Sequence, residues 1–256
     1  MLSNIIEIII LSIVQGISEF LPISSSAHLN IIEIIFEFNS NSLMIDVSLH
    51  LGSLLAIIFY FKKELLDLRN NQKLLSLMII GTIPIAIAGY IISTTGLINL
   101  LQNNLKIIAW TTLIFGIVLY FADKSKFNKK ISSNLNLKTI LYIGLFQILA
   151  LIPGVSRAGI TITAARFFSF NRFDSSKISF LLAIPAIAGA SVLQLKNAIE
   201  QNFELNYLIL ISITLSFLFS YFTVKFFLEY INKFSLNIFV IYRIIISIIL
   251  FIIIYN

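Results

Sequence analysis

The sequence predicts an all-α protein that crosses a membrane several times. Hydrophobic residues make up 58% of its 256 residues and charged residues only 12%, about half the share of charge in a soluble domain. The mean hydropathy is +0.97. The apolar segments are nearly continuous runs of Ile, Leu and Phe rather than alternating ten-residue strands, so they favour helices over a barrel.

Six segments have the roughly 20 apolar residues that a membrane-spanning helix needs. The predicted spans are 44–61, 74–93, 105–122, 178–196, 207–230 and 237–255. Two further apolar stretches, 4–38 and 139–170, are each interrupted by a proline and a polar cluster, at Pro22 and Pro153. Such interruptions at membrane depth are tolerated only inside protein or beside a water-filled cavity, so we expect two broken or re-entrant helical elements, which could themselves add crossings.

The loops predict an orientation. Segments 62–73 and 123–138 are rich in lysine and arginine, whereas 94–104 and 197–206 contain neither. The positive-inside rule therefore places the first pair of loops in the cytoplasm and the second pair, with the C-terminus, outside. The net charge of +6 is explained by this topology without a nucleic-acid partner, and the lack of cysteine excludes disulfides and thiolate metal ligands.

The chain reads as one membrane domain made of two related halves, about 1–128 and 129–256. Matching positions are Gln15 with Gln147, Pro22 with Pro153, and the Leu-Leu-Ala-Ile runs at 54–57 and 181–184. Each half would hold one broken element and three spans. Because three is an odd number of crossings, the second half would have the opposite orientation in the membrane to the first. Short matches also arise by chance in an apolar chain, but the matched proline and serine positions favour an inverted-topology repeat.

Two isolated charges lie beside the interrupting prolines. Glu19 is the one charged residue between Glu7 and Glu33, and Arg157 is the one between Lys138 and Arg166. A lone charge in the hydrocarbon region costs at least about 2.5–3.5 kcal/mol, so it usually faces a cavity or an opposite charge. The repeat would make Glu19 and Arg157 neighbours. A purely structural ion pair would explain the two charges, but not the polar residues around them.

The first motif, Pro22 to His28, has the composition of a half-helix start. Serines there can cap free N–H groups, and the helix N-terminus favours an anion. Ser25 and His28 are spaced i, i+3, so a hydroxyl and an imidazole can share one face as an activated nucleophile. A simple cap is the alternative interpretation. His50 fits a buried core histidine and a pocket residue equally well.

The second motif, Pro153 to Thr161, is more specific. Gly154 permits a close backbone approach, Ser156 and Thr161 offer hydroxyls, and Arg157 offers a fork of donors that fits phosphate. This composition predicts a phosphate cradle, although the lysine of a Walker loop is missing. A packed helix break with a snorkelling arginine is the alternative.

These two motifs resemble those of the bacterial undecaprenyl-diphosphate phosphatase family, also known for bacitracin resistance. The stretch Gln15 to His28 fits its [Glu/Gln]-x-x-x-Glu and F-L-P-[VI]-S-S-[ST]-[GA]-H pattern, and Pro153 to Thr161 fits P-G-x-S-R-S-x-x-T. One position departs: Ala158 replaces the serine after the arginine, which puts any essential role of that hydroxyl in doubt. The resemblance covers essentially the whole chain.

The resemblance implies hydrolysis of undecaprenyl diphosphate to undecaprenyl phosphate and inorganic phosphate in the bacterial inner membrane, at a site that opens toward the outer face and depends on a divalent cation, Mg or Ca. The implied catalytic residues are Glu19, Ser25, His28 and Arg157; the implied phosphate-binding residues are Ser24, Gly154, Ser156, Arg157 and Thr161; Gln15 supports them. Our hypothesis is that Ser25 attacks the phosphorus or positions a water, and that His28 moves the proton. Glu19, with Gln15, would bind the cation or orient His28.

Two other functions compete with this one. A polyprenyl-phosphate transporter or flippase also fits an inverted repeat of broken helices, but a carrier needs no Ser-His pair. The second membrane phosphatase superfamily needs a histidine downstream of its Ser-Arg motif, and no histidine follows His50. The sequence leaves open the preferred prenyl chain length and whether the protein forms a homodimer.

Overall fold

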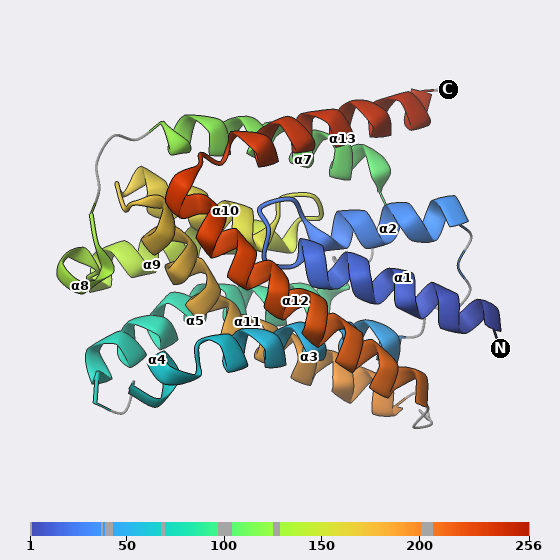
Figure 1. Cartoon of the computed structure of the whole chain (residues 1–256), viewed down its shortest axis with the longest axis horizontal. Coiled ribbons are helices and arrows are strands. Elements are labelled where there is room, and N and C mark those ends of the chain that lie inside the picture. Colours follow the sequence, from blue (N-terminus) through green and yellow to red (C-terminus); the bar gives the residue numbers. More distant parts are fainter. Residues whose placement is uncertain are drawn as a thin grey trace.

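The structure, a computed structural model, describes residues 2–36, 38, 43–67, 70–96, 104–124, 129–200 and 207–255. Most of these residues are helical, which confirms the predicted fold class (Figure 1). In this part of the chain, six helices are long and apolar enough to cross a membrane, at the predicted places. They are α3 (Leu43–Tyr60), α5 (Gln72–Thr95), α7 (Leu105–Asp123), α11 (Arg172–Glu200), α12 (Tyr207–Lys233) and α13 (Asn237–Tyr255).

The two interrupted stretches form helical hairpins. The first hairpin consists of α1 (Leu2–Ser18), a tip, and α2 (Ser25–Phe36). The second hairpin consists of α9 (Leu137–Gln147), a 3-10 turn (Ile148–Leu151), a tip, and α10 (Arg157–Phe167). Each tip contains the predicted proline, because a proline lacks a donor N–H and disfavours helix at the residue before it. In both hairpins the two helices pack against each other.

Polar side chains mark where several helices begin. The amide oxygen of Asn71 accepts from the backbone N–H of Leu74 at the start of α5, and that of Asn104 accepts at the start of α7. Asn136 caps α9 in the same way, through the N–H of Thr139. The asparagines between apolar segments thus satisfy N–H groups that would otherwise have no partner, and they fix the helix boundaries.

The helices are arranged around the two hairpin tips. Figure 1 shows α7 and α13 side by side along one edge, with α12 crossing the molecule diagonally over α3. The first hairpin lies at the end of the molecule where α13 also ends, whereas the short helices α4 (Lys62–Asp67) and α8 (Ile131–Asn134) lie at the opposite end. The lysine-rich loops are therefore at one end, as the orientation prediction requires.

Small and polar residues hold the spans together. At the contact of α3 with α12, a side chain on Gly52 would come within 2.5 Å of the Ile213 carbonyl oxygen, so the two backbones nearly touch. Beside this contact, Ser53 Oγ lies 3.0 Å from Ser216 Oγ and 2.9 Å from Ser220 Oγ. Close backbone approach and interhelical hydrogen bonds are what bind helices in lipid, where burying apolar surface gives little gain.

A phenylalanine anchors the tip of the first hairpin in the core. Phe20 is fully buried, and its ring meets the ring of Phe180 of α11 edge to face at 5.4 Å. Phe180 in turn contacts Phe227 of α12 and Phe61, which follows α3. This cluster fixes the backbone beside Phe20, and with it the position of the neighbouring Glu19.

Candidate active site

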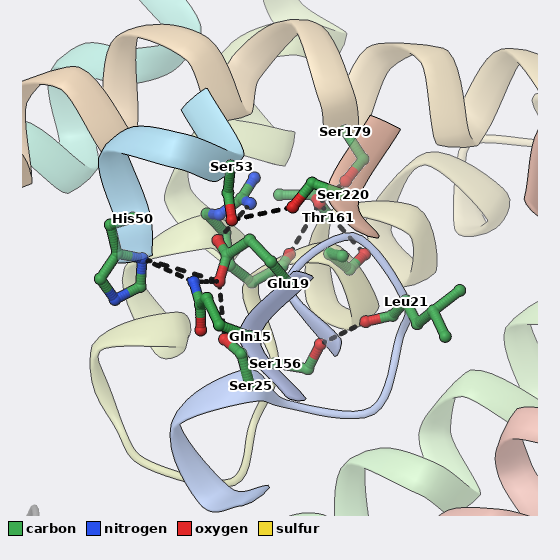
Figure 2. Close-up of polar contacts among 12 residues, drawn as sticks. Gln15, Glu19, Leu21, Ser25, His50, Ser53, Ser156, Thr161, Ser179 and Ser220 are labelled. Atoms are coloured by element: carbon green, nitrogen blue, oxygen red, sulfur yellow. Dashed lines mark hydrogen bonds and ion pairs between the residues drawn. The ribbon is translucent and has the colours of Figure 1, made fainter. Parts of the chain in front are cut away.

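The two hairpin tips meet, and they bring the two isolated charges together. Arg157 Nη2 donates to Glu19 Oε1 at 2.9 Å, which joins the first residue of α10 to the tip of the first hairpin. Ser156 Oγ also reaches the first hairpin, 3.5 Å from the Leu21 carbonyl oxygen (Figure 2). The predicted contact between an acidic and a basic tip is therefore present. The inverted repeat of the two halves stays a prediction.

The second carboxylate oxygen of Glu19 receives two further hydrogen bonds. Ser25 Oγ donates to Glu19 Oε2 at 2.7 Å, and Gln15 Nε2 donates to the same oxygen at 3.0 Å. Gln15 Nε2 also lies 3.0 Å from His50 Nδ1 (Figure 2). Because an amide nitrogen can only donate, Nδ1 is the acceptor, and the neutral imidazole of His50 carries its proton on Nε2. Glu19 is thus the centre of a network that includes the candidate nucleophile Ser25.

A cavity of about 220 Å³ lies at this network. Of the residues predicted for the site, Glu19, Ser24, Ser25, Ser156 and Arg157 line it. The other lining residues are Ser26, His50, Ile85, Ala150, Leu151, Ala186, Ile187, Ala190 and Gln194. The cavity is therefore polar where the tips meet and apolar where α5 and α11 close it.

Two half-helices begin at the cavity, and each is preceded by a serine in a left-handed conformation. Ser24, with φ of 77°, precedes α2, and Ser156, with φ of 70°, precedes α10. A non-glycine residue in this conformation costs about 1–3 kcal/mol and tends to occur at functional sites. The turns start both half-helices at the cavity, and helix N-termini there favour a bound anion.

Two buried polar atoms of the network have no hydrogen-bond partner among the described residues. They are Arg157 Nη1 and Gln15 Oε1. Buried polar groups are nearly always satisfied, so a donor of an arginine that lines a cavity and has no partner calls for an explanation. Nη2 of Arg157 is paired with Glu19, whereas Nη1 is not.

His28 does not lie with Ser25 as the sequence analysis expected. Its Nδ1 is 2.6 Å from the Ser24 carbonyl oxygen, and its Nε2 is 2.6 Å from Tyr242 Oη on α13. A carbonyl only accepts, so Nδ1 carries the proton and Nε2 accepts from the tyrosine. His28 is not among the residues that line the cavity. The interaction that Ser25 makes is with Glu19, and the role of His28 in moving a proton stays a prediction.

Gly154 and Thr161 lie behind the cavity and not on its wall. Gly154 has φ of 85° and packs tightly against α7, where any side chain would collide with Thr111. Thr161 is buried, with its Oγ1 2.7 Å from the Arg157 carbonyl oxygen and 2.6 Å from Ser179 Oγ (Figure 2). Both residues support the loop that carries Arg157. Their predicted role in touching phosphate is not visible in this arrangement.

Sequence reasoning left His50 between two interpretations, and the structure places it at the cavity with 31% of its side chain exposed. Its position on α3 gave no motif, so only the packing of α3 against the first hairpin could decide. Ala158 is fully buried and does not line the cavity. A serine hydroxyl at position 158 would therefore not face this cavity.

An apolar groove of about 600 Å³ adjoins the cavity between α5 and α11. The two share Ile85, Leu151, Ala186, Ala190 and Gln194 as lining residues. All four prolines of the chain lie near this region: two are in the hairpin tips, and Pro84 and Pro185 lie inside α5 and α11. A proline inside a helix removes a backbone hydrogen bond and bends the helix, which opens space between neighbours.

The site has few ligands for a metal ion. Among the described residues no group of three or more His, Asp and Glu side chains is placed to hold an ion. The Glu19 carboxylate lines the cavity, and Gln15, which donates to that carboxylate from behind the cavity wall, has an Oε1 without a partner among the described residues. Ions such as Mg²⁺ are often held by one or two carboxylates together with substrate phosphates, so these two oxygens fit a cation that arrives with a diphosphate.

Fold and site together define a class: a polytopic helical membrane protein with an internal cavity that is lined by charged and polar side chains and adjoins an apolar groove. Within this class, the chain belongs to the Bacitracin resistance protein BacA family, which it matches over residues 8–249.

Relatives with the name undecaprenyl-diphosphatase are similar over nearly the whole chain. The protein of that name from Pelagibacter ubique (strain HTCC1062) is 91% identical over 256 residues, covering 100% of both chains. The one from Elusimicrobium minutum (strain Pei191) is 40% identical, over 96% of this chain and 97% of the relative. The one from Campylobacter curvus (strain 525.92) is 39% identical, over 96% of this chain and 98% of the relative. The family resemblance predicted from the two motifs is confirmed.

Proposed function

We propose that this protein hydrolyses undecaprenyl diphosphate to undecaprenyl phosphate and inorganic phosphate, and so recycles the lipid carrier of cell-wall synthesis in a bacterial inner membrane. One observation carries the proposal: Glu19 joins the hydroxyl of Ser25 to the guanidinium of Arg157 inside a cavity that adjoins an apolar groove. The names of the similar proteins support the same substrate.

The cavity fits the charged end of such a lipid. The free Nη1 of Arg157 would bind a terminal phosphate oxygen, and the N-termini of α2 and α10 would favour its negative charge. The first isoprene units would lie in the groove between α5 and α11, whose lining is mostly apolar. A soluble phosphate ester would leave that groove unfilled, which is why we favour a lipid substrate.

The hydrogen bond between Ser25 and Glu19 sets the direction of the first proton transfer. Ser25 Oγ attacks the terminal phosphorus and its proton passes to Glu19 Oε2, 2.7 Å away. The new O–P bond forms as the bond from phosphorus to the bridging oxygen breaks, so undecaprenyl phosphate leaves. Water then attacks the phosphoserine and the bond from phosphorus to Ser25 Oγ breaks; the proton held by Glu19 returns to Ser25 Oγ, and both hydrogens of the water leave with the phosphate as H2PO4−. Throughout, Arg157 stabilises the charge on the transferred group.

A divalent cation, Mg²⁺ or Ca²⁺, belongs to this proposal because the family resemblance implies one. Glu19 and Gln15 Oε1 would hold it, together with oxygens of the diphosphate. When bound, the ion neutralises charge on the diphosphate and so reduces its repulsion by Glu19. A second copy of the chain is not needed for any of the contacts named here.

The site would open toward the outer face of the membrane. The groove is lined by Gly89, Tyr90 and Ser93 near the end of α5, and by Leu193 and Gln194 of α11. These residues lie far along the chain from Lys73 at the start of α5 and from Arg172 and Lys177 at the start of α11, the ends that the positive-inside rule places in the cytoplasm. The opposite end of α11 carries one basic residue, Lys196.

The proposal is tested with purified protein in detergent, where transport across a membrane is not possible. Wild type supplied with undecaprenyl diphosphate should release inorganic phosphate, and a chelator should reduce the release. Ser25→Ala should abolish it, whereas Ser26→Ala, which changes another hydroxyl of the cavity wall, should retain most of it. Absence of release by wild type would overturn the proposal and leave the transporter alternative.

The covalent step has its own measurement. Rapid quenching of wild type with labelled substrate should trap a phosphorylated enzyme, and Ser25→Ala should lose the label while Ser26→Ala keeps it. Phosphate release without a trapped phosphoserine would indicate direct attack by water, with Ser25 placing that water.

A further inference from the structure

The last helix carries an arginine that the motifs do not explain. Arg243 lies near the middle of α13 and is only 1% exposed. It is the single charged residue in the apolar run from Asn237 to Tyr255, so the reasoning that singled out Arg157 would also have found it. No described carboxylate lies within ion-pair distance of it.

All five donor hydrogens of Arg243 are used by backbone carbonyl oxygens. Nε donates to Thr112 at 3.0 Å and Nη2 reaches Thr111 at 3.4 Å, both on α7. The remaining bonds go to the hairpin tips: Nη1 to Pro22 at 3.2 Å, Nη1 to Val155 at 3.1 Å and Nη2 to Gly154 at 2.8 Å. One side chain thus ties the first tip, the second tip and α7 together.

The backbone carbonyls of the two tips require a hydrogen-bond donor from elsewhere in the molecule. Their carbonyls are not part of a regular helix, and an unsatisfied carbonyl away from water costs about as much as a lost hydrogen bond. The position is built for an arginine: a side chain on Gly116 of α7 would come within 3.2 Å of Arg243 Cβ, and one on Gly159 of α10 would come within 3.1 Å of its Nη1. Its donors are all occupied and its surface is covered, so Arg243 has no capacity left to bind substrate.

We propose that Arg243 is a positioning residue: it fixes the two tips relative to each other, and thereby sets the spacing between Ser25 on one and Arg157 on the other. Pro22 is three residues before Ser25, and Val155 is two residues before Arg157. A small shift of either tip would therefore separate the nucleophile from the group that holds the phosphate. This inference rests on the proposed function, because it is the reaction that requires the spacing.

The test compares Arg243→Lys with Ser247→Ala. Ser247 is a matched control because it lies one turn further along α13, is fully buried, and donates to a carbonyl of α7, that of Ala109 at 2.8 Å, but to neither tip. A lysine has three donors on a flexible stem and cannot span five carbonyls. We expect kcat for phosphate release to fall about a hundredfold in Arg243→Lys, the effect of a displacement near 1 Å, with KM changed less than about threefold. Ser247→Ala should stay within about twofold of wild type.

A second readout separates positioning from a general loss of structure. The second readout uses an Arg157→Lys background, which retains a positive charge but lacks the paired donors of the guanidinium. There Arg243→Lys should lower kcat much less than it does in wild type, because the exact distance between Ser25 and residue 157 matters less. The proposal would be overturned if Arg243→Lys lowered kcat by the same factor in wild type and in Arg157→Lys, or if it changed KM alone. Failure of Arg243→Lys to fold would also overturn it and make Arg243 a folding residue. Failure of the proposed function itself would appear differently, as no phosphate release by wild type.

Discussion

The two hairpins have the same architecture but different surroundings. Each has a proline in its tip and a serine with positive φ directly before a half-helix, and they meet through Glu19 and Arg157. The half-helix of the second hairpin is buried on all sides from Ala158 to Arg166, whereas α2 has buried side chains mainly at Ala27 and Leu29.

This difference indicates a division of labour. The second hairpin is held rigidly by its surroundings and presents one guanidinium, as a cradle for phosphate should. The first hairpin presents the hydroxyl and the carboxylate that would exchange a proton, and its helix α2 is less buried. Two similar hairpins thus supply opposite charges from two environments, and the reaction would take place where they meet.

Removal of the basic partner should have the largest effect. Arg157→Ala leaves the phosphate without its main cation, so we expect phosphate release to fall about a thousandfold, as when a preorganised donor to a transition state is lost. Phosphate release by purified protein measures it. The control is Lys177→Ala, which removes a basic residue that pairs with Glu64 far from the cavity. Near-normal release by Arg157→Ala would remove the cradle from the mechanism.

Removal of the acidic partner, Glu19, should have the second-largest effect on phosphate release. Glu19→Gln keeps the size of the side chain but takes away the acceptor for the Ser25 proton, and we expect kcat to fall by about a hundredfold or more. It also leaves Arg157 buried without its ion pair, so thermal unfolding in detergent should shift to lower temperature. If unfolding shifts while kcat does not, the pair is structural only.

The two histidines should differ in the same assay. His50 Nδ1 accepts one hydrogen bond from Gln15, and the amide oxygen of a glutamine can accept the same bond, so His50→Gln should cost no more than about threefold. His28→Gln loses the bond to Tyr242 and the ring stacked on it, and kcat should fall about a hundredfold if His28 takes part in the later proton transfer, after Glu19 has accepted the proton of Ser25. The reverse order would assign that later transfer to His50.

The smallest effects concern the strained serines and are seen in stability. Ser24→Gly relieves a left-handed residue and loses only a weak contact with Ser26 Oγ, so it should raise the free energy of unfolding by up to about 1 kcal/mol. Ser156→Gly relieves the same strain but loses the cap on the N–H of Gly159, so its gain should be smaller. Thermal unfolding measures both. Ser26→Gly, inside α2, should lower stability, as glycine does within a helix.

Sequence alone was enough to predict the membrane class, the six spans, the two interruptions and the family. These features are local: a bilayer requires long apolar helices, and proline ends a helix wherever it occurs. The isolated charges at positions 19 and 157 could also be identified, because the cost of a charge in lipid makes each one informative. The pairing of these two residues followed from the repeat and was correctly predicted.

Which polar groups share the cavity became apparent only from the packing of the helices. The i, i+3 spacing placed Ser25 and His28 on one face, but packing against α13 turned the imidazole to Tyr242, while α3 brought His50 to Gln15. Arg243 could be found as an isolated charge, but its five carbonyl partners lie on three segments that are distant in the chain. Hydrogen bonds between such segments depend on how helices pack, and helix periodicity carries no information about that.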